Sequence, residues 1–444
     1  MKRKSESKKF YLMLGVVVVI ALLVVLSSTI LFAGKPKSKE EPAPAEVKEE
    51  KAAPAEEKVE TVKIGFLVPL TGEAAAWGLP GLYGAQMWVE DVNEAGGIKA
   101  GGKTYMVEIV KYDDENISSK ALLGAKKLVL EEDVSVVLNM AGATVTAIQD
   151  FLTKNEMLSI SLAPYDTRPE APYHLATVEP SMIYHLDTVR YIKETYPDVQ
   201  KVAIVAQDDI LGIIGLAILR AAIEAEGMEL VYDKFYGFET TDFAPIMTAI
   251  LAKKPDLISF DGGYSYYVEL LAEQAYLLGY EGYLESAEFI LGSLSAKVPM
   301  EWLEGRTIAS FPDWDDPKLP KYSHDFYAEY NERWPGQWGA VSWEYAANLD
   351  VWRKGVEKAG SVDPMDVFKA LKSMDTIQTI YGEGRWGGED MWGIDNWLMT
   401  TWHTTNVVNG KHSIVSSQMI LLDWAARNPG NMDILIEQFR DAGL

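Results

Sequence analysis

The sequence predicts an α/β protein with two lobes, each built on a parallel β-sheet with helices on both faces. Three observations support this prediction. Short apolar, β-rich segments alternate with helical patterns from Thr61 onward, and the alternation starts again after about Ser181. A chain of 444 residues is also too long for one compact core, because single cores stop growing at about 250–300 residues.

The first series contains runs of Val, Ile and Leu that are typical of buried strands. These predicted strands are residues 62–69, 106–112, 135–139 and 157–161. Apolar residues at helical spacing predict the helices between them, which are residues 81–94, 118–132 and 144–155. The pair Gly96-Gly97 marks the end of the first of these helices.

The second series repeats the pattern with strands at residues 201–207, 229–233 and 256–261. Helices are predicted from Leu211, from Phe243 and over residues 266–278. Because ligands of such sheets bind beyond the carboxyl ends of the strands, the loops after these strands are the expected site.

The N-terminal region predicts a membrane tether. Residues 1–9 are a basic stub, and residues 10–34 form an uncharged, Val- and Leu-rich segment long enough to cross a bilayer as a helix. The basic flank stays in the cytoplasm, so everything after Lys35 is expected outside. The alternative is a long signal peptide cut near Ala33, although residues 31–33 fit the cleavage rule poorly.

Residues 35–60 are dominated by Lys, Glu, Pro and Ala and predict a disordered linker. Only the basic stub remains in the cytoplasm, so any signal or cargo must pass to a separate protein.

Composition excludes several classes of function. The chain has 41 Lys and Arg against 65 Asp and Glu, a net charge of −24, which argues against a nucleic-acid partner. It has no cysteine, which excludes disulfides, thiolate nucleophiles and Cys-based metal sites. It also excludes the lipidated Cys of a bacterial lipoprotein, where this chain has Ala33-Gly34.

Three motifs that resemble chemical sites have simpler interpretations. Residues 382–387 spell GxGxxG without a strand-to-helix entry, so we expect a turn-rich loop rather than a dinucleotide site. The acidic residues 113–115 are expected at a solvated strand end with a turn at Asn116, rather than around a cation. The five histidines show no ligand spacing, and no nucleophile and base are paired, so we expect no metal, no cofactor and no enzyme.

The order of several segments resembles a known family. Residues 63–116, which begin KIGFLVPLTGEAAAWG, resemble the opening of the periplasmic leucine/isoleucine/valine-binding proteins. These are the type I substrate-binding components of branched-chain amino acid ABC transporters. The similarity continues through ISLAPYDTRPE, ATVEPSMI, TTDFAPIM, KPDLISFDGGY and WEYAANLDVW to WHTTNVVNGK, and so covers residues 62–411.

The resemblance implies a periplasmic binding protein type I fold, with a ligand cleft between the lobes. It places residues 61–182 and 313–392 in the first lobe, and residues 183–312 and 393–444 in the second. Relatives hold the ligand carboxylate at the loop that here reads NMAGAT (139–144). Ala143 and Thr144 are therefore implied contacts, and free N–H groups at a helix start suit an anion. Thr144 as a simple helix cap is the alternative.

The resemblance implies further ligand contacts. Ala163 and Tyr165 match a second carboxylate-contacting loop, although Pro164-Tyr165 and an extra residue depart from its pattern. Glu288 matches the acidic residue that pairs with the ligand ammonium, and a carboxylate in a closing cleft needs such a cation. The contacts with the rest of the ligand are expected from two aromatic residues in loops, Trp77 and Tyr264.

One departure concerns specificity. Relatives commonly have Asp-x-x-Tyr-Gly after the first strand of the second lobe, whereas residues 208–212 here read DDILG. Leu211 therefore replaces an aromatic ring that usually contacts the ligand.

The function implied is an extracytoplasmic, membrane-anchored substrate-binding protein of an ABC-type uptake system. It is expected to capture a small amino acid, branched-chain or similar, by hinge closure and to deliver it to ABC permease and ATPase subunits. Two alternatives stay open: a ligand that is an amine-free carboxylate or an amide, and a sensor that regulates a separate signalling partner.

Overall fold

The computed structural model describes residues 58–444 apart from residues 73, 178–179, 238 and 262–264. The predicted cytoplasmic stub and membrane anchor lie outside the described residues, as does most of the predicted linker. The linker prediction (35–60) is wrong at its end, because β1 already begins at Lys58. In the part of the chain that the structure describes, no helix is long and apolar enough to cross a membrane.

The first of two sheets has the strand order β12-β13-β14-β6-β5-β4-β1-β3-β2 in the described residues. Pairing is parallel from β14 to β3 and antiparallel at both edges. The bounds are β1 (Lys58–Val68), β2 (Ile98–Ala100), β3 (Lys103–Asp113), β4 (Val136–Asn139), β5 (Ser159–Ser161), β6 (His174–Thr177), β12 (Ile377–Thr379), β13 (Gly382–Gly387) and β14 (Trp397–Met399). Residues 64–68 of β1 and all of β4 are buried, as expected for parallel strands that are covered on both faces.

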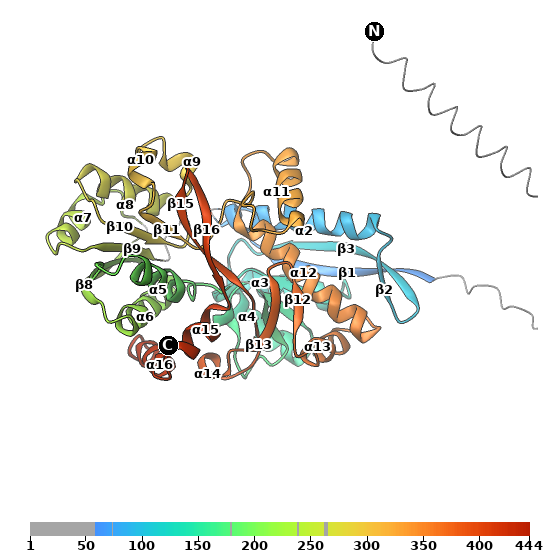
Figure 1. The fold of residues 1–444 in the computed structure, drawn as a ribbon. Coiled ribbons are helices and arrows are strands. Elements are labelled where there is room, and N and C mark those ends of the chain that lie inside the picture. Colours follow the sequence, from blue (N-terminus) through green and yellow to red (C-terminus); the bar gives the residue numbers. More distant parts are fainter. Residues whose placement is uncertain (1–57, 73, 178–179, 238, 262–264) are drawn as a thin grey trace, which may run out of the picture. The chain divides into compact units, whose positions relative to one another are not determined.

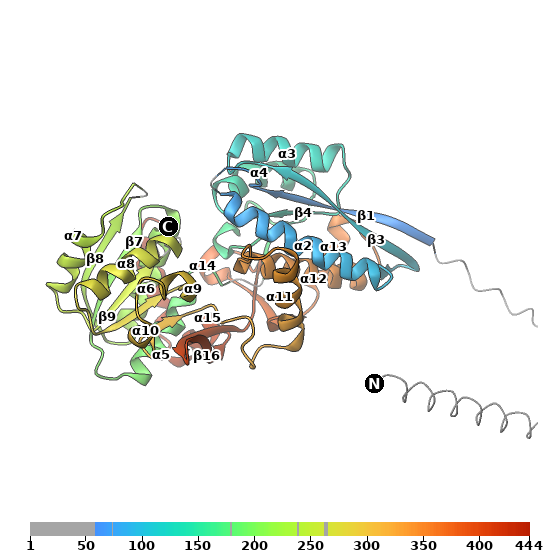
Figure 2. The same ribbon diagram turned by 90° about the horizontal axis from the view of Figure 1, so that it is seen from above.

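Helices cover both faces of this sheet (Figure 2). On one face α2 (Ala75–Glu94) packs beside α12 (Ala340–Ala359), and on the other α3 (Ser118–Leu130) packs beside α4 (Ala143–Lys154). The α2 and α12 backbones are so close that a Cβ on Gly84 would lie 1.9 Å from the Ser342 carbonyl oxygen. The remaining helices of this lobe are η1 (Pro164–Asp166, a 3-10 helix), α11 (Lys321–Arg333), α13 (Pro364–Lys372) and α14 (Glu389–Trp392).

The second sheet has the order β16-β15-β11-β10-β9-β7-β8, parallel from β11 to β8. Its strands are β7 (Lys201–Gln207), β8 (Glu229–Tyr236), β9 (Leu257–Asp261), β10 (Tyr283–Ser286), β11 (Thr307–Ala309), β15 (Trp402–Val408) and β16 (Lys411–Gln418). The helices around it are α5 (His185–Thr195), α6 (Ile210–Ala225), α7 (Ala244–Leu251), α8 (Ser265–Leu277), α9 (Leu291–Leu294), α10 (Met300–Leu303), α15 (Ile420–Arg427) and α16 (Asn431–Asp441). Figure 1 shows α5 and α6 on one face and α7 and α8 on the other. The predicted α/β fold with two parallel-dominated sheets is confirmed.

Three segments connect the two sheets, after β6, after β11 and between β14 and β15. Each has one aromatic ring within it or directly after it, and these rings form a cluster: the ring centroids of Tyr184 and Phe311 are 6.4 Å apart, and those of Phe311 and Trp402, the first residue of β15, are 5.4 Å apart. The cluster is part of a hydrophobic core that continues from one sheet to the other. The connections are therefore packed by side chains and are not loose linkers.

Two predictions about the C-terminal part need correction. Strand pairing places β14 in the first sheet, so the last crossover falls after Met399 rather than at the predicted boundary of residue 392. The GxGxxG motif is the strand β13, paired with β12 and β14, rather than a turn-rich loop. Its glycines lie in an antiparallel ladder, and the helix that follows, α14, has only four residues, whereas a dinucleotide site needs a parallel strand that leads into a full helix.

Candidate functional site

The candidate site begins at the carboxyl ends of β4 and β5, which are neighbours in the first sheet. The loops that follow are bonded to each other, because the Leu162 N–H donates to the Met140 carbonyl at 2.9 Å. Gly142 has a φ of 79°, a conformation that favours glycine, and it turns the chain directly into α4. Two loops that are distant in sequence thus form one surface at the start of α4.

Ala143 and Thr144, which the family resemblance places at a ligand carboxylate, are the first two residues of α4. Ala143 is exposed, and Thr144 is buried. The first N–H groups of a helix have no acceptor within the helix, and the helix dipole adds partial positive charge there. Both residues lie at a helix start as predicted, and their ligand contacts remain a prediction.

Asp166 also lies at this helix start, and sequence reasoning missed it. Its carboxylate accepts the Gly142 N–H, at 3.0 Å to Oδ1 and 3.3 Å to Oδ2. The residue is only 4% exposed. Burial raises the pKa of Asp166 to about 7, although the Gly142 N–H and the Ser161 hydroxyl favour the ionised form. An acid of the protein itself therefore lies beside the predicted carboxylate position.

Buried polar groups continue from Asp166 into the sheet. Ser161 Oγ lies 3.0 Å from His174 Nε2, and Ser159 Oγ lies 2.8 Å from His174 Nδ1. Burial lowers the pKa of His174 to about 3, so the imidazole is neutral. Ser161 lies between the acid and the imidazole and is fully buried. In a serine nucleophile site the imidazole lies between the serine and the acid, so this arrangement does not match one.

The other first-lobe predictions fall on residues that also pack against the core. Ala163 is buried after β5, and Tyr165 is half-buried in η1. Trp77 was predicted in a loop, and this is wrong: α2 begins at Ala75 rather than Gly81, so Trp77 lies in its first turn. Trp77 and Tyr165 are partly buried rings in contact with the main core.

In the second lobe, Glu288 follows β10 and is half-buried. The chain on either side of it is fixed. The Ser310 N–H donates to the Ala287 carbonyl at 2.9 Å, and His412 Nε2 lies 2.9 Å from the Phe289 carbonyl that it bonds to. Tyr264 lies outside the described residues. Glu288 is therefore the predicted second-lobe residue that the structure positions.

A fully buried ionic cluster lies just before these second-lobe loops, and sequence reasoning missed it. His185 contacts Glu285 Oε1 through Nδ1 and Asp261 Oδ1 through Nε2, both at 2.7 Å. Thr188 and Ser259 also donate to the Glu285 carboxylate, at 2.7 and 2.5 Å. Burial alone would lower the pKa of His185, but the two carboxylates raise it to about 10. The imidazole is therefore a buried cation that joins the ends of β9 and β10.

Residues 208–212 (DDILG), where the sequence departs from its relatives, form the start of α6 and its cap. Asp209 accepts the Gly212 N–H at 2.9 Å and caps α6, while Gln207 Nε2 donates to its second oxygen at 2.7 Å. Leu211 is half-buried in the first turn of α6. Of the acidic residues 113–115, Asp113 accepts the Leu70 N–H of the chain after β1, and Asp114 accepts the Asn116 N–H of its own turn, both at 2.8 Å.

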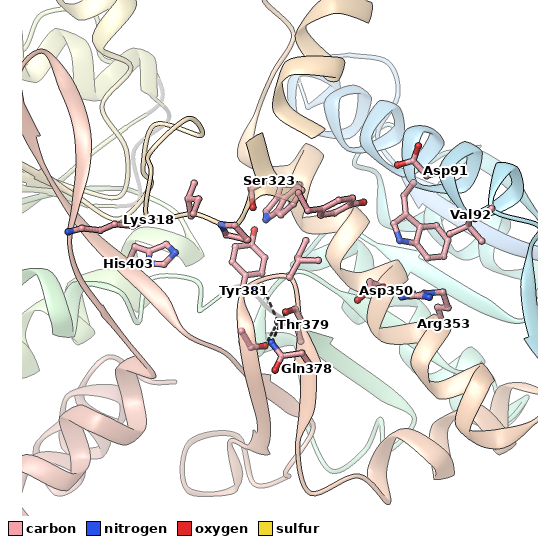
Figure 3. A pocket seen from close by; sticks show the side chains of 18 residues that line it. Asp91, Val92, Lys318, Ser323, Asp350, Arg353, Gln378, Thr379, Tyr381 and His403 are labelled. Atoms are coloured by element: carbon pink, nitrogen blue, oxygen red, sulfur yellow. Dashed lines mark hydrogen bonds and ion pairs between the residues drawn. The ribbon is translucent and has the colours of Figure 1, made fainter. Parts of the chain in front are cut away.

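A separate cavity of about 690 Å³ lies between α2, α12 and the crossover segments (Figure 3). Its walls include the rings of Trp88, Tyr322, Trp343 and Tyr381, and the Asp350–Arg353 ion pair at 2.5 Å. None of the predicted site residues lines it. The described residues contain no group of three or more His, Asp or Glu placed to hold a metal ion.

Known proteins resemble this chain over most of its length. A Leu/Ile/Val-binding protein of Rhizobium johnstonii is 28% identical over 340 residues, which are 73% of this chain and 87% of that protein. A leucine-, isoleucine-, valine-, threonine- and alanine-binding protein of Pseudomonas aeruginosa is 26% identical, over 78% of this chain and 90% of that protein.

Solved structures share the fold. The substrate-binding protein LivJ of Streptococcus pneumoniae, in complex with isoleucine, has a TM-score of 0.65 at 19% identity and covers 81% of this chain and 99% of its own. A solute-binding protein of R. palustris, in complex with 4-hydroxybenzoate, has the same score and identity and covers 81% and 97%. A family profile described as "Periplasmic binding protein" matches residues 61–406, which confirms the predicted resemblance. The chain therefore belongs to the periplasmic binding protein family.

Proposed function

We propose that this protein is the substrate-binding component of an ABC-type uptake system and captures a small amino acid between its two lobes. The observation that carries the proposal is the contrast between two strand-end regions. The first sheet ends in the exposed start of α4, which offers N–H donors, and the second ends in the half-buried carboxylate of Glu288. An α-amino acid has a carboxylate for the first and an ammonium for the second.

Closure of the lobes would make both sets of contacts at once. The two sheets are joined by three crossovers, which is where a hinge rotation would be absorbed. Only the closed form satisfies both ends of the ligand, so the ligand selects that form. A permease that recognises the closed form would then receive loaded protein.

The names of the relatives support the class of ligand, and the sequence of the N-terminus supports a position at the membrane. Curated relatives are named for binding leucine, isoleucine and valine. The apolar segment 10–34 would hold the protein at the cytoplasmic membrane, with the folded part outside, beside ABC permease and ATPase subunits. The partners would thus be a small-molecule ligand and these two kinds of subunit.

A second candidate ligand is an amine-free aromatic carboxylate. Two observations favour it: Leu211 stands where relatives have a tyrosine, and a structural neighbour is in complex with 4-hydroxybenzoate. Such a ligand has no ammonium for Glu288, so the two candidates differ in how they depend on that residue.

The test is calorimetric titration of the full-length protein with leucine, isoleucine, valine and 4-hydroxybenzoate. We expect a branched-chain amino acid to bind with one site and Glu288→Gln to weaken it about 30-fold or more, because a buried charge pair loses one partner. The control Glu301→Gln changes an exposed glutamate of the same lobe and is expected to leave affinity unchanged. Tight binding of 4-hydroxybenzoate, unaffected by Glu288→Gln, would favour the second candidate.

A further inference from the structure

We propose that Asp166 is a specificity-determining residue of the interlobe site, because its carboxyl group lies at the start of α4 and admits a ligand carboxylate there only when it carries a proton. This inference rests on the proposed function, since it concerns how the same site receives the ligand.

The geometry fixes the Asp166 carboxyl group beside the helix start. Both of its oxygens face the Gly142 N–H, at 3.0 and 3.3 Å, directly before the first residue of α4. The backbone is held as well, because Gln149 Nε2 donates to the Asp166 carbonyl at 2.7 Å, and Arg168 Nε donates to Gln149 Oε1 at 2.5 Å. Only 4% of the residue is exposed, so the carboxyl group is largely shielded from solvent. A ligand carboxylate at Ala143 and Thr144 would therefore meet this acid.

The groups around Asp166 place the pKa of its carboxyl group close to neutral pH. Burial is the largest influence and raises its pKa to about 7, while the Arg168 guanidinium, on the segment after η1, lowers it. From β5, the Ser161 hydroxyl bonds to Asp166 and also lies 3.0 Å from His174 of β6. His174 is neutral there, because burial lowers its pKa to about 3. The contribution from α4 is the uncharged Gln149 amide.

Two carboxylates at one helix start cannot both remain ionised without a large repulsion. The ligand carboxylate would hence bind the protonated form of Asp166, and binding would raise the pKa of Asp166 further. The protein ready to accept a carboxylate is then the protonated fraction, and the apparent affinity scales with that fraction. With a pKa of about 7, this fraction falls about tenfold between pH 6 and pH 8.

The experiment is calorimetric titration of the full-length protein with leucine at pH 6 and pH 8, each in two buffers with different ionisation enthalpies. We expect the dissociation constant to rise about tenfold from pH 6 to pH 8, with about one proton taken up per leucine at pH 8. Asp166→Asn keeps an acceptor for the Gly142 N–H and cannot ionise. It should bind about tenfold more tightly than the native protein at pH 8, without pH dependence or proton uptake.

The matched control is Asp150→Asn, an exposed acid on α4 itself, which should keep the native pH dependence. Proton uptake by the native protein is a readout that does not require the Asp166 variant to fold. Saturable leucine binding with no proton uptake and no change between pH 6 and pH 8 would overturn this inference and leave the proposed function standing. Absence of binding by any amino acid, native or variant, at either pH would overturn the proposed function and this inference with it.

Discussion

The two lobes each bury a histidine near their strand ends, and one of these histidines is neutral while the other is a cation. In the first lobe His174 lies between the hydroxyls of Ser159 and Ser161, and burial lowers its pKa to about 3. In the second lobe His185 lies between the carboxylates of Asp261 and Glu285, which raise its pKa to about 10. Burial is nearly the same for both, so the neighbours decide the charge.

The lobes also differ in whether a buried cation contacts the acidic groups near their strand ends. His185 is the first residue of α5, directly after the first crossover, and it joins the ends of β9 and β10 by fixed ionic contacts. The chain directly after β10 carries Glu288. In the first lobe the acidic group is Asp166, which has no buried cation in direct contact among the described residues and can gain or lose a proton near neutral pH. The second lobe thus holds its buried acids against a cation, although burial raises the pKa of Asp261, and the first lobe has an acid that titrates near neutral pH.

The largest expected effect comes from removing the buried cation. His185→Ala leaves two buried carboxylates without their counter-charge and should lower the free energy of unfolding by about 3–5 kcal/mol. The matched change His174→Ala removes a neutral ring and its two hydroxyl contacts and should cost about 1–3 kcal/mol. Urea unfolding of both variants at pH 7 measures the contrast. Equal losses would mean that the His185 cluster is not an ionic cluster.

A second test adds a methyl group beside the same cluster. A Cβ on Gly215 of α6 would lie 2.0 Å from both carboxylate oxygens of Asp261. Gly215→Ala should therefore lower the free energy of unfolding by about 1–3 kcal/mol, through displacement of the Asp261 carboxylate. The control Gly237→Ala, at an exposed glycine of the same lobe with open space around it, should change stability by less than about 0.5 kcal/mol. A Gly215→Ala protein as stable as this control would place Asp261 elsewhere.

The smallest effect is the change in stability per pH unit, and its sign should differ between the lobes. The folded pKa of His174 is below the unfolded value of about 6.5, so the unfolded chain binds more protons below that pH. The stability difference between the native protein and His174→Ala should therefore shrink as pH falls from 6.5 to 5, by at most about 1.4 kcal/mol per unit.

For His185 the folded pKa is raised, so its contribution is complete below about pH 6.5 and is lost as pH rises toward 10. The difference between the native protein and His185→Ala should shrink from pH 6.5 to 9. Urea unfolding across both ranges measures the two slopes. Slopes of the same sign would contradict the assigned charge states.

The sequence predicted those elements of the fold that depend on neighbouring residues alone, such as apolar runs and helical spacing. The strands from 201–207 and 256–261 are continuous apolar runs, and the structure has β7 and β9 there. The start of α4 was predicted to within one residue, because the helical spacing of apolar residues begins at Thr144. In contrast, α2 begins at Ala75 although Pro80 lies inside it, so the helix was predicted too short and Trp77 was assigned to a loop.

The important groups that sequence reasoning missed depend on partners distant in the chain. Asp166 matters because Gly142 lies against it, and His185 because Asp261 and Glu285 surround it, 76 and 100 positions away. No local pattern marks such contacts, since they arise when strand ends meet at one edge of a sheet. The pairing of β14 with β6 also joins segments that are distant in the chain. It places the last boundary between the lobes after Met399 rather than after residue 392.

The most direct test of the central claim is the structure of the protein with a bound branched-chain amino acid. We predict the ligand between the two sheets, with its ammonium in hydrogen-bond contact with the Glu288 carboxylate and its carboxylate at the first N–H groups of α4, beside Asp166. A ligand found instead in the cavity lined by Trp88, Trp343 and Tyr381, with Glu288 and the start of α4 both without ligand contact, would contradict it.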